Sequence, residues 1–247
     1  MNKILLSLLF ALTLNAETIN IAVAANVSYA IDELKAEFAK EHPETKIRVT
    51  LGSSGKLTAQ IKNGAPYGLF MSANMRYPNA LYAEGIAITK PIVYAQGGLA
   101  FLSVRKYDLS KGIVLLHNKQ IKKIAIANPK TAPYGIATVE ALKNAKIHEA
   151  IRSKFVYGES ISQTVSYTVT ATDIGIIAKS SLYSSKMKQF KENVHWMPLD
   201  PSLYTPIQQG IVLLKYANKN RAYQAFYNFI LSPKAKAIFK KYGYLIS

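Results

Sequence analysis

The chain has 247 residues, of which 49% are hydrophobic and 18% charged, a composition that excludes a disordered chain and a protein built mainly of membrane spans. Lysine and arginine number 31 against 14 aspartates and glutamates, and the resulting charge of +17 suggests nucleic acid, an acidic surface or an anionic ligand as a partner. The absence of cysteine excludes disulfides, thiol nucleophiles and thiolate metal sites.

Residues 1–16 have the pattern of a secretory signal peptide. Lys3 supplies the positive start, and the apolar run from Ile4 to Leu14 is much shorter than the ~20 residues of a membrane span. The run ends at a small residue, Ala16, as signal peptidase sites do. The alternative is a first buried strand or helix, but a better strand follows at once. We therefore expect the mature chain to start at Glu17 and to be exported to the periplasm.

The first part of the mature chain predicts alternating strands and helices. Residues 18–24 and 46–51 read as strands, residues 27–38 carry a helical apolar stripe, and a helix capped by Ser54 stops at Gly64 before a strand at 69–73. This β-α-β-α-β order predicts a parallel sheet with crossover helices. In such sheets, ligands bind beyond the carboxyl ends of the strands.

The second part of the chain predicts a similar arrangement. Its expected strands are 98–104, 124–127, 155–158, 173–178, 195–197 and 210–214, and its expected helices are 134–143, 161–170 and two that close the chain. We expect two α/β lobes that the chain crosses near Tyr94–Gln96 and again near Tyr204–Pro206. Lobe I then comprises residues 17–95 with 206–247, and lobe II residues 96–205.

Several predicted helices start in short polar or small residues. Ala25–Ser28, Gly52–Gly55 and Ala132–Gly135 are of this kind, and Glu159–Ser162 is a weaker case. A helix N-terminus offers free N–H groups and about half a positive charge, which suits an anion. For any one of these segments considered by itself, the alternative interpretation is an ordinary helix N-cap without a ligand. At Gly52–Gly55 the glycines favour close approach of the backbone to a ligand.

The sequence carries poor signals for an enzyme. Ser53 and Ser54 do not form the G-x-S-x-G pattern of a serine hydrolase. The chain has no Walker loop and no G-x-G-x-x-G. The histidines, at positions 42, 117, 148 and 195, have no partner at metal-ligand spacing. These observations favour a binding protein without cofactor or bare metal ion.

Four stretches resemble the periplasmic molybdate-binding proteins, which are the receptors of molybdate ABC importers. They are GSSGKLTAQIKNGAPYGLFMSAN, IANPKTAPYGIATVEAL, YGESISQTVSYTVTATDIGII and SPKAKAIFKKYGYLI. The resemblance covers essentially the whole mature chain, in the right order and spacing. It implies an α/β, two-lobed periplasmic-binding-protein fold of type II with the ligand cleft between the lobes. It also implies a monomer whose partner is the membrane permease of the importer.

The resemblance further implies that a molybdate or tungstate oxyanion is held by neutral donors. Matched position by position, the ligand-binding residues are Asn26, Ser54, the backbone N–H of Tyr134 and that of Ile161. Ser28 and Ser53 are secondary candidates. Many members have a tyrosine donor where this chain has Ala178. The site therefore loses one donor, or another group such as the amide of Asn26 replaces it.

Other functions remain as alternatives. A different tetrahedral oxyanion, sulfate or phosphate, fits the same helix starts, although phosphate would gain from an acidic acceptor that the first two ligand loops lack. An exported hydrolase could use Ser53 or Ser54. A nucleic-acid binder is disfavoured by the signal peptide and by the lack of a basic and aromatic stripe. The basic residues occur singly or in pairs, so we interpret them mostly as solvated faces of helices. Long-range attraction of anions is the alternative role of the excess positive charge.

Overall fold

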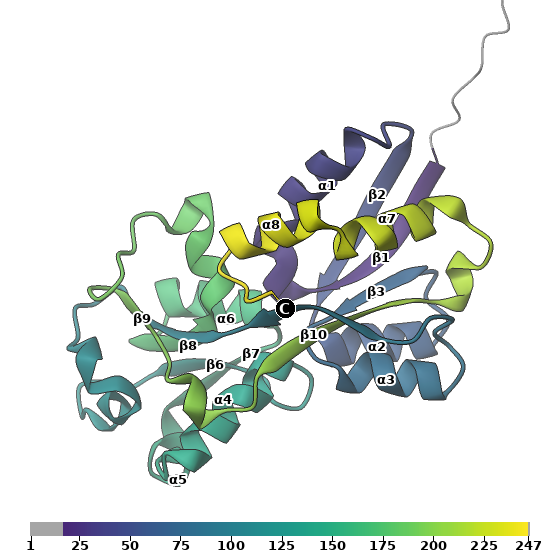
Figure 1. Ribbon diagram of the computed structural model, residues 1–247. Helices are drawn as coiled ribbons and strands as arrows, with labels where there is room; N and C mark the ends of the chain where they lie inside the picture. The colour runs from purple at the N-terminus through teal and green to yellow at the C-terminus, as the bar shows by residue number, and fades with distance from the viewer. Residues whose placement is uncertain (1–16, 247) are drawn as a thin grey trace, which may run out of the picture.

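The computed structural model describes residues 17–246, so the predicted signal peptide lies outside the described part of the chain. The molecule has two halves, each with a five-stranded mixed sheet and flanking helices (Figure 1). We call the half that contains the first sheet lobe I and the other lobe II. Within residues 17–246 no helix is long and apolar enough to cross a membrane.

The sheet of lobe I has the order β2-β1-β3-β10-β4. Its strands are β1 (Glu17–Ala24), β2 (Thr45–Gly52), β3 (Leu69–Ser72), β4 (Ile92–Gly97) and β10 (Ile207–Leu213). The first three are parallel, as predicted, whereas β10 pairs antiparallel with β3 and β4. Strand β10, from the C-terminal part of the chain, therefore completes the sheet between β3 and β4.

Helices cover both faces of this sheet (Figure 1). One face packs against α1 (Ile31–Ala39), α7 (Arg221–Leu231) and α8 (Pro233–Lys241), and the other against α2 (Ser54–Lys62) and α3 (Arg76–Ala83). Successive side chains of β1 point to opposite faces of the sheet. Ile21 packs into the core beneath α1, α7 and α8, and its neighbour Ala22 packs into the core beneath α2 and α3. Both residues are fully buried.

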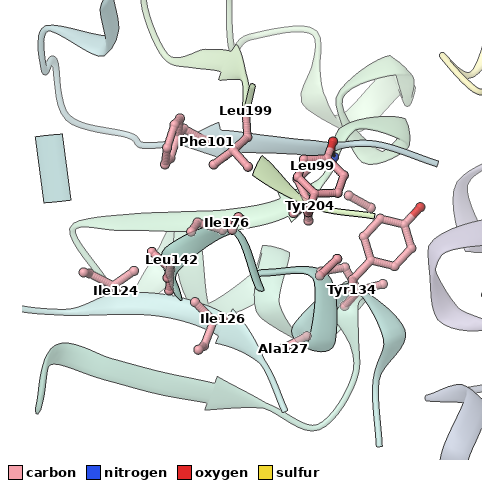
Figure 2. Close-up of a cluster of buried hydrophobic side chains, with 14 of the residues drawn as sticks. Leu99, Phe101, Ile124, Ile126, Ala127, Tyr134, Leu142, Ile176, Leu199 and Tyr204 are labelled. Carbon is pink, nitrogen blue, oxygen red and sulfur yellow. Dashed lines mark hydrogen bonds between the residues drawn. The ribbon is translucent and has the colours of Figure 1, made fainter. Parts of the chain in front are cut away.

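The sheet of lobe II has the order β7-β6-β8-β5-β9. Its strands are β5 (Leu99–Leu102), β6 (Ile124–Ala127), β7 (Phe155–Gly158), β8 (Ile174–Ala178) and β9 (Trp196–Pro198), and its helices are α4 (Pro133–Asn144), α5 (His148–Ile151) and α6 (Ile161–Thr170). Strands β6, β7 and β8 are parallel, and β5 pairs antiparallel with both β8 and β9. Figure 2 shows one core of this lobe, in which Leu142 of α4 lies near Ile124 and Ile176 of the sheet.

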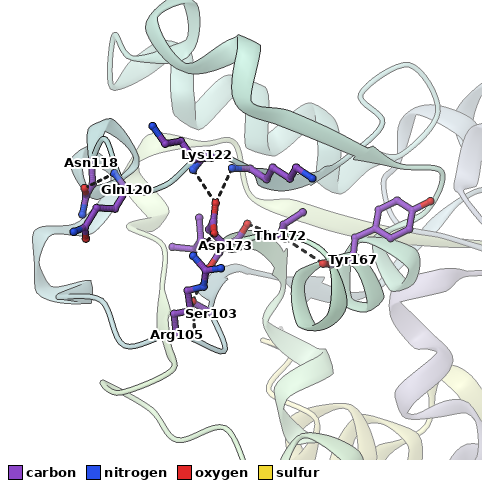
Figure 3. Close-up of polar contacts among 10 residues, drawn as sticks. Ser103, Arg105, Asn118, Gln120, Lys122, Tyr167, Thr172 and Asp173 are labelled. Carbon is purple, nitrogen blue, oxygen red and sulfur yellow. Dashed lines mark hydrogen bonds and ion pairs between the residues drawn. The ribbon is translucent and has the colours of Figure 1, made fainter.

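A polar cluster fixes the entry to β8 (Figure 3). The carboxylate of Asp173 accepts the backbone N–H groups of Lys122 and Lys123 at 2.7 and 2.9 Å and pairs with Arg105 at 2.6 Å. The hydroxyl of Ser103 donates to the Asp173 carbonyl at 2.6 Å. These bonds satisfy the nearly buried carboxylate, so the cluster has a structural role.

The structure corrects several local predictions. Ser54 does not cap α2: it is the first helical residue, and Ser53 occupies the N-cap position. The hydroxyl of Ser54 instead accepts the backbone N–H of Ala73 at 2.9 Å. The predicted helix 27–38 is divided into a 3-10 turn, Ala25–Tyr29, and α1. Gly64 follows α2 with a φ of +85°, as a helix stop requires.

The chain passes between the sheets at two places. Strand β4 ends at Gly97 and β5 begins at Leu99, so the first passage lies at Gly98, whereas the predicted Tyr94–Gln96 lies inside β4. The second passage follows β9 and ends at β10. The two passages are tied together, since the Leu99 N–H donates to the hydroxyl of Tyr204 at 3.0 Å.

We predict that Gly135→Ala destabilises the protein by about 1–3 kcal/mol. A Cβ at this position of α4 would lie 2.2 Å from the carbonyl oxygen of Ala127 in β6, so the helix would have to move off the sheet. Urea denaturation measures the change. Gly98→Ala is the matched control, because its Cβ would meet nothing nearer than the Tyr204 hydroxyl at 3.7 Å. Equal stability of the two variants would contradict the proposed close packing.

Candidate ligand-binding site

A small cavity of about 10 Å³ lies where the two lobes meet. That is about the space of one water-sized sphere, so the cavity suits only a small ion or molecule. The structure brings all four predicted site residues to its wall. The lining residues are Ala24, Ala25, Asn26, Gly52, Ser53, Ser54, Ala73, Ala132, Pro133, Tyr134 and Ile161. Ser28, a secondary candidate, is not among them.

Strand register explains the lobe I wall. Strands β1 and β2 run parallel, and Ala24 pairs with Gly52 at their carboxyl ends. The segments that follow, Asn26 in a 3-10 turn and Ser53–Ser54 at the start of α2, therefore lie side by side. Asn26 and Ser54 are both fully buried.

The lobe II wall is built by the same rule. Strands β6 and β7 run parallel and end with the pair Ala127 and Gly158, so the starts of α4 and α6 are neighbours. Tyr134 is the second residue of α4, after Pro133, and Ile161 is the first residue of α6. Their N–H groups precede the first intrahelical hydrogen bond and have no backbone acceptor within residues 17–246. Both helix starts therefore present donors and partial positive charge to the cavity.

Two serine hydroxyls add donors. The Ser54 oxygen accepts the Ala73 N–H, which leaves the hydroxyl proton available for a ligand. Ser53 is 4% exposed, and its hydroxyl has no hydrogen-bond partner among the described residues. A buried polar group without a partner costs about 1–3 kcal/mol. An anion in the cavity would remove that cost.

The side chain of Asn26 is held by the protein itself. Its Nδ2 donates to Gln209 Oε1 at 2.8 Å and to the Tyr244 hydroxyl at 3.0 Å, so both amide hydrogens are engaged. Its backbone N–H remains the group suited to a ligand. Ala178 stands where many family members have a tyrosine donor, and the Asn26 amide was a possible replacement for it. Because that amide is engaged, the arrangement favours a site with one donor fewer.

The cavity wall carries no acidic, basic or histidine side chain. Within residues 17–246 no group of three or more histidine, cysteine, aspartate or glutamate side chains could hold a metal ion. Burial raises the pKa of Tyr134 well above its ordinary value, and the nearby phenols of Tyr244, Tyr94 and Tyr204 add to the shift. The tyrosine therefore stays neutral. An anion here would meet hydrogen-bond donors without a counter-charge.

The lobes are in direct contact around the cavity. The Gly55 N–H donates to the Thr131 carbonyl at 2.9 Å, and Lys56 pairs with Glu159 at 3.8 Å across the lobes. A Cβ on Gly55 would lie 2.9 Å from the Thr131 carbonyl oxygen, so glycine permits this approach. The structure is thus a closed arrangement in which the cavity is enclosed from both sides.

Comparison with known proteins defines the class. The sequence pattern of the family described as bacterial extracellular solute-binding protein matches residues 19–245. The chain belongs to this family. The two mixed sheets with flanking helices are the two-lobed α/β fold that the sequence predicted.

Several individual relatives of this chain are named for molybdate binding. A protein of Azotobacter vinelandii named molybdate-binding protein ModA is 35% identical over 96% of this chain and 93% of its own length. Its namesake in Rhodobacter capsulatus is 34% identical over 91% of this chain and 86% of its own length. The solved structure of the periplasmic molybdate-binding protein of A. vinelandii matches with a TM-score of 0.85 and 29% identity, over 93% of this chain and 99% of the other.

We predict that ionisation of Tyr244 lowers the free energy of unfolding at alkaline pH. Burial raises its pKa from 10.0 to about 12, so above pH ~10 the unfolded phenol loses its proton while the folded one keeps it, and unfolding becomes easier. Between pH ~9 and ~12 the wild type should lose roughly 2 kcal/mol more unfolding free energy than Tyr244→Phe.

Urea denaturation at a series of pH values measures this difference. Tyr82→Phe is the control, because that side chain is 40% exposed, and it should follow the wild-type pH profile. Parallel profiles for the wild type and Tyr244→Phe would refute the role given to Tyr244.

Proposed function

We propose that this chain binds molybdate, and also tungstate, in the periplasm and delivers the oxyanion to the permease of an ABC importer. The observation that carries the proposal is the small uncharged cavity, whose wall combines helix starts and hydroxyls from both lobes. The family and the two relatives named for molybdate support it.

We assign the donors as follows. Lobe I supplies the hydroxyl and N–H of Ser54 and the N–H of Asn26, and lobe II supplies the N–H groups of Tyr134 and Ile161. The unpartnered hydroxyl of Ser53 is a further donor. Each hydrogen bond to a charged group contributes about 1.5–3 kcal/mol, and several together offset the desolvation of a dianion.

Selection among oxyanions follows from the same wall. Phosphate is protonated in part at neutral pH and gains from an acidic acceptor, and no cavity residue is acidic. Sulfate carries the same charge as molybdate but has shorter bonds, so discrimination rests on the fit of a rigid cavity. Sulfate is therefore the main alternative ligand.

We further propose that the protein acts as a monomer without a cofactor and is not an enzyme. No histidine lies on the cavity wall to activate Ser53 or Ser54, which disfavours the hydrolase alternative. Residues 1–16 serve as the signal peptide. The two units that move when the cleft opens and closes are lobe I, from β1 to β4 and from β10 onward, and lobe II, from β5 to β9.

A thermal-shift panel tests the ligand. Molybdate and tungstate should raise the melting temperature, because a ligand that binds only the folded protein stabilises it, by about 2.7 kcal/mol at a hundredfold excess over Kd. Sulfate and phosphate at the same concentration should have little effect. A larger shift with sulfate than with molybdate would sink the assignment.

We predict that Ser54→Ala weakens molybdate binding at least tenfold, because it removes a hydroxyl donor to a charged ligand. Isothermal titration calorimetry measures the affinity. Ser103→Ala is the matched control: its buried hydroxyl also bonds within the protein, to Asp173, but lies outside the cavity wall. That variant should lose stability and keep the wild-type affinity. Unchanged affinity in Ser54→Ala would remove Ser54 from the site.

A further inference from the structure

A buried polar network lies behind the ligand cavity and includes side chains of both lobes. Its centre is Gln209 in β10, which is fully buried and stands at a bulge where the pairing with β4 shifts. Bulges re-aim side chains and often adjoin functional sites. The function proposed above assigns no role to Gln209.

The carboxamide of Gln209 contacts three side chains. Its Oε1 accepts from Asn26 Nδ2 and from the Tyr94 hydroxyl, each at 2.8 Å. Its Nε2 donates to the hydroxyl of Tyr134 at 3.3 Å. Asn26 and Tyr94 belong to lobe I, whereas Tyr134 comes from α4 of lobe II. One side chain therefore joins a cavity residue of each lobe.

We propose that Gln209 is a positioning residue that couples the Asn26 side of the site to closure of lobe II through the Tyr134 hydroxyl. This inference rests on the proposed function and deepens it. Asn26 is held further by Tyr244, whose hydroxyl donates to the Asn26 carbonyl at 2.9 Å. These bonds fix Asn26 within lobe I, and its carbonyl also accepts a longer bond, at 3.4 Å, from the Ser180 hydroxyl of lobe II. That bond and the bond from Gln209 to Tyr134 both join the lobes, so both form when the lobes come together.

Within residues 17–246, the Tyr134 hydroxyl is bonded to the Gln209 side chain and is a different group from the backbone N–H assigned to the ligand. Tyr134 lies at the edge of the lobe II core, with its ring extending away from Leu142 and Ile124 (Figure 2). The hydroxyl is so close to the first passage between the lobes that a Cβ on Gly97 would lie 2.1 Å from it. The group assigned to the ligand is the backbone N–H of the same residue, so the two roles can be separated by mutation.

Tyr134→Phe makes that separation, since it keeps the backbone N–H and removes the hydroxyl. The variant should release radiolabelled molybdate about fivefold faster in a chase with unlabelled molybdate, because one neutral hydrogen bond of the closed form is lost. Its association rate should stay within about twofold of the wild type. Its melting temperature without ligand should be unchanged, because the bond is absent when the lobes are apart.

Tyr94→Phe is the matched control, because it also removes a hydroxyl bonded to Gln209 but within lobe I. It should lower the melting temperature with and without ligand and leave the dissociation rate near the wild-type value. In a Gln209→Leu background, Tyr134→Phe should have no further effect on dissociation.

The outcomes separate the two proposals. Wild-type protein that takes up no molybdate overturns the proposed function and this inference with it. Wild-type protein that binds molybdate, with Tyr134→Phe releasing it at the wild-type rate, overturns the inference alone. A Tyr134→Phe variant that loses as much melting temperature without ligand as with it also overturns the inference, because the hydroxyl would then stabilise the fold and not the closed form.

Discussion

The constraint on which the proposed function depends is the burial of a doubly negative ion without a positive side chain. Loss of hydration is costly for such an ion, and only a set of well-placed donors offsets it. The closed cavity supplies donors from helix starts and serine hydroxyls, and its wall is otherwise small and apolar, with alanines at four positions. A neutral site also keeps its character over a wide pH range, because nothing on the wall changes charge near neutrality.

Parallel strand pairing places those donors. In each lobe two neighbouring parallel strands end opposite each other, Ala24 with Gly52 and Ala127 with Gly158. The helix or turn that follows each strand must then begin at the same edge of its sheet. The repeated geometry explains how residues far apart in sequence reach one small cavity.

Much of the fold and the site could be predicted from the sequence because their signals are local. The strand-then-polar-turn pattern indicated four segments, and the resemblance to the family singled out Asn26, Ser54, Tyr134 and Ile161 within them. All four line the same cavity. Helix α3 was missed because Pro78 and Asn79 lie within its first turn, where proline is tolerated but reads as a break. Helix α6 forms as predicted although it is rich in β-branched residues, which lower helix propensity; the Thr168 hydroxyl bonds back to the Thr164 carbonyl at 2.8 Å.

The polar network could not be predicted in the same way. Gln209 and Tyr244 lie 183 and 218 residues from Asn26 in sequence, and a glutamine in a strand gives no local sign of such partners. Ser53 is a similar case, since the sequence analysis ranked it only as a secondary candidate after Ser54. Only packing shows that the Ser54 oxygen bonds to Ala73 while that of Ser53 has no partner among the described residues.

The division of the cavity wall between two lobes has a consequence for unloading. Under the proposed function neither half alone surrounds the oxyanion, so a transporter that moves the halves a short way apart exposes the ion to water and removes the donors of one lobe at once. No proton transfer and no chemical change in the protein is required. Emptying the site is then a mechanical event, reversible as soon as the halves are let go.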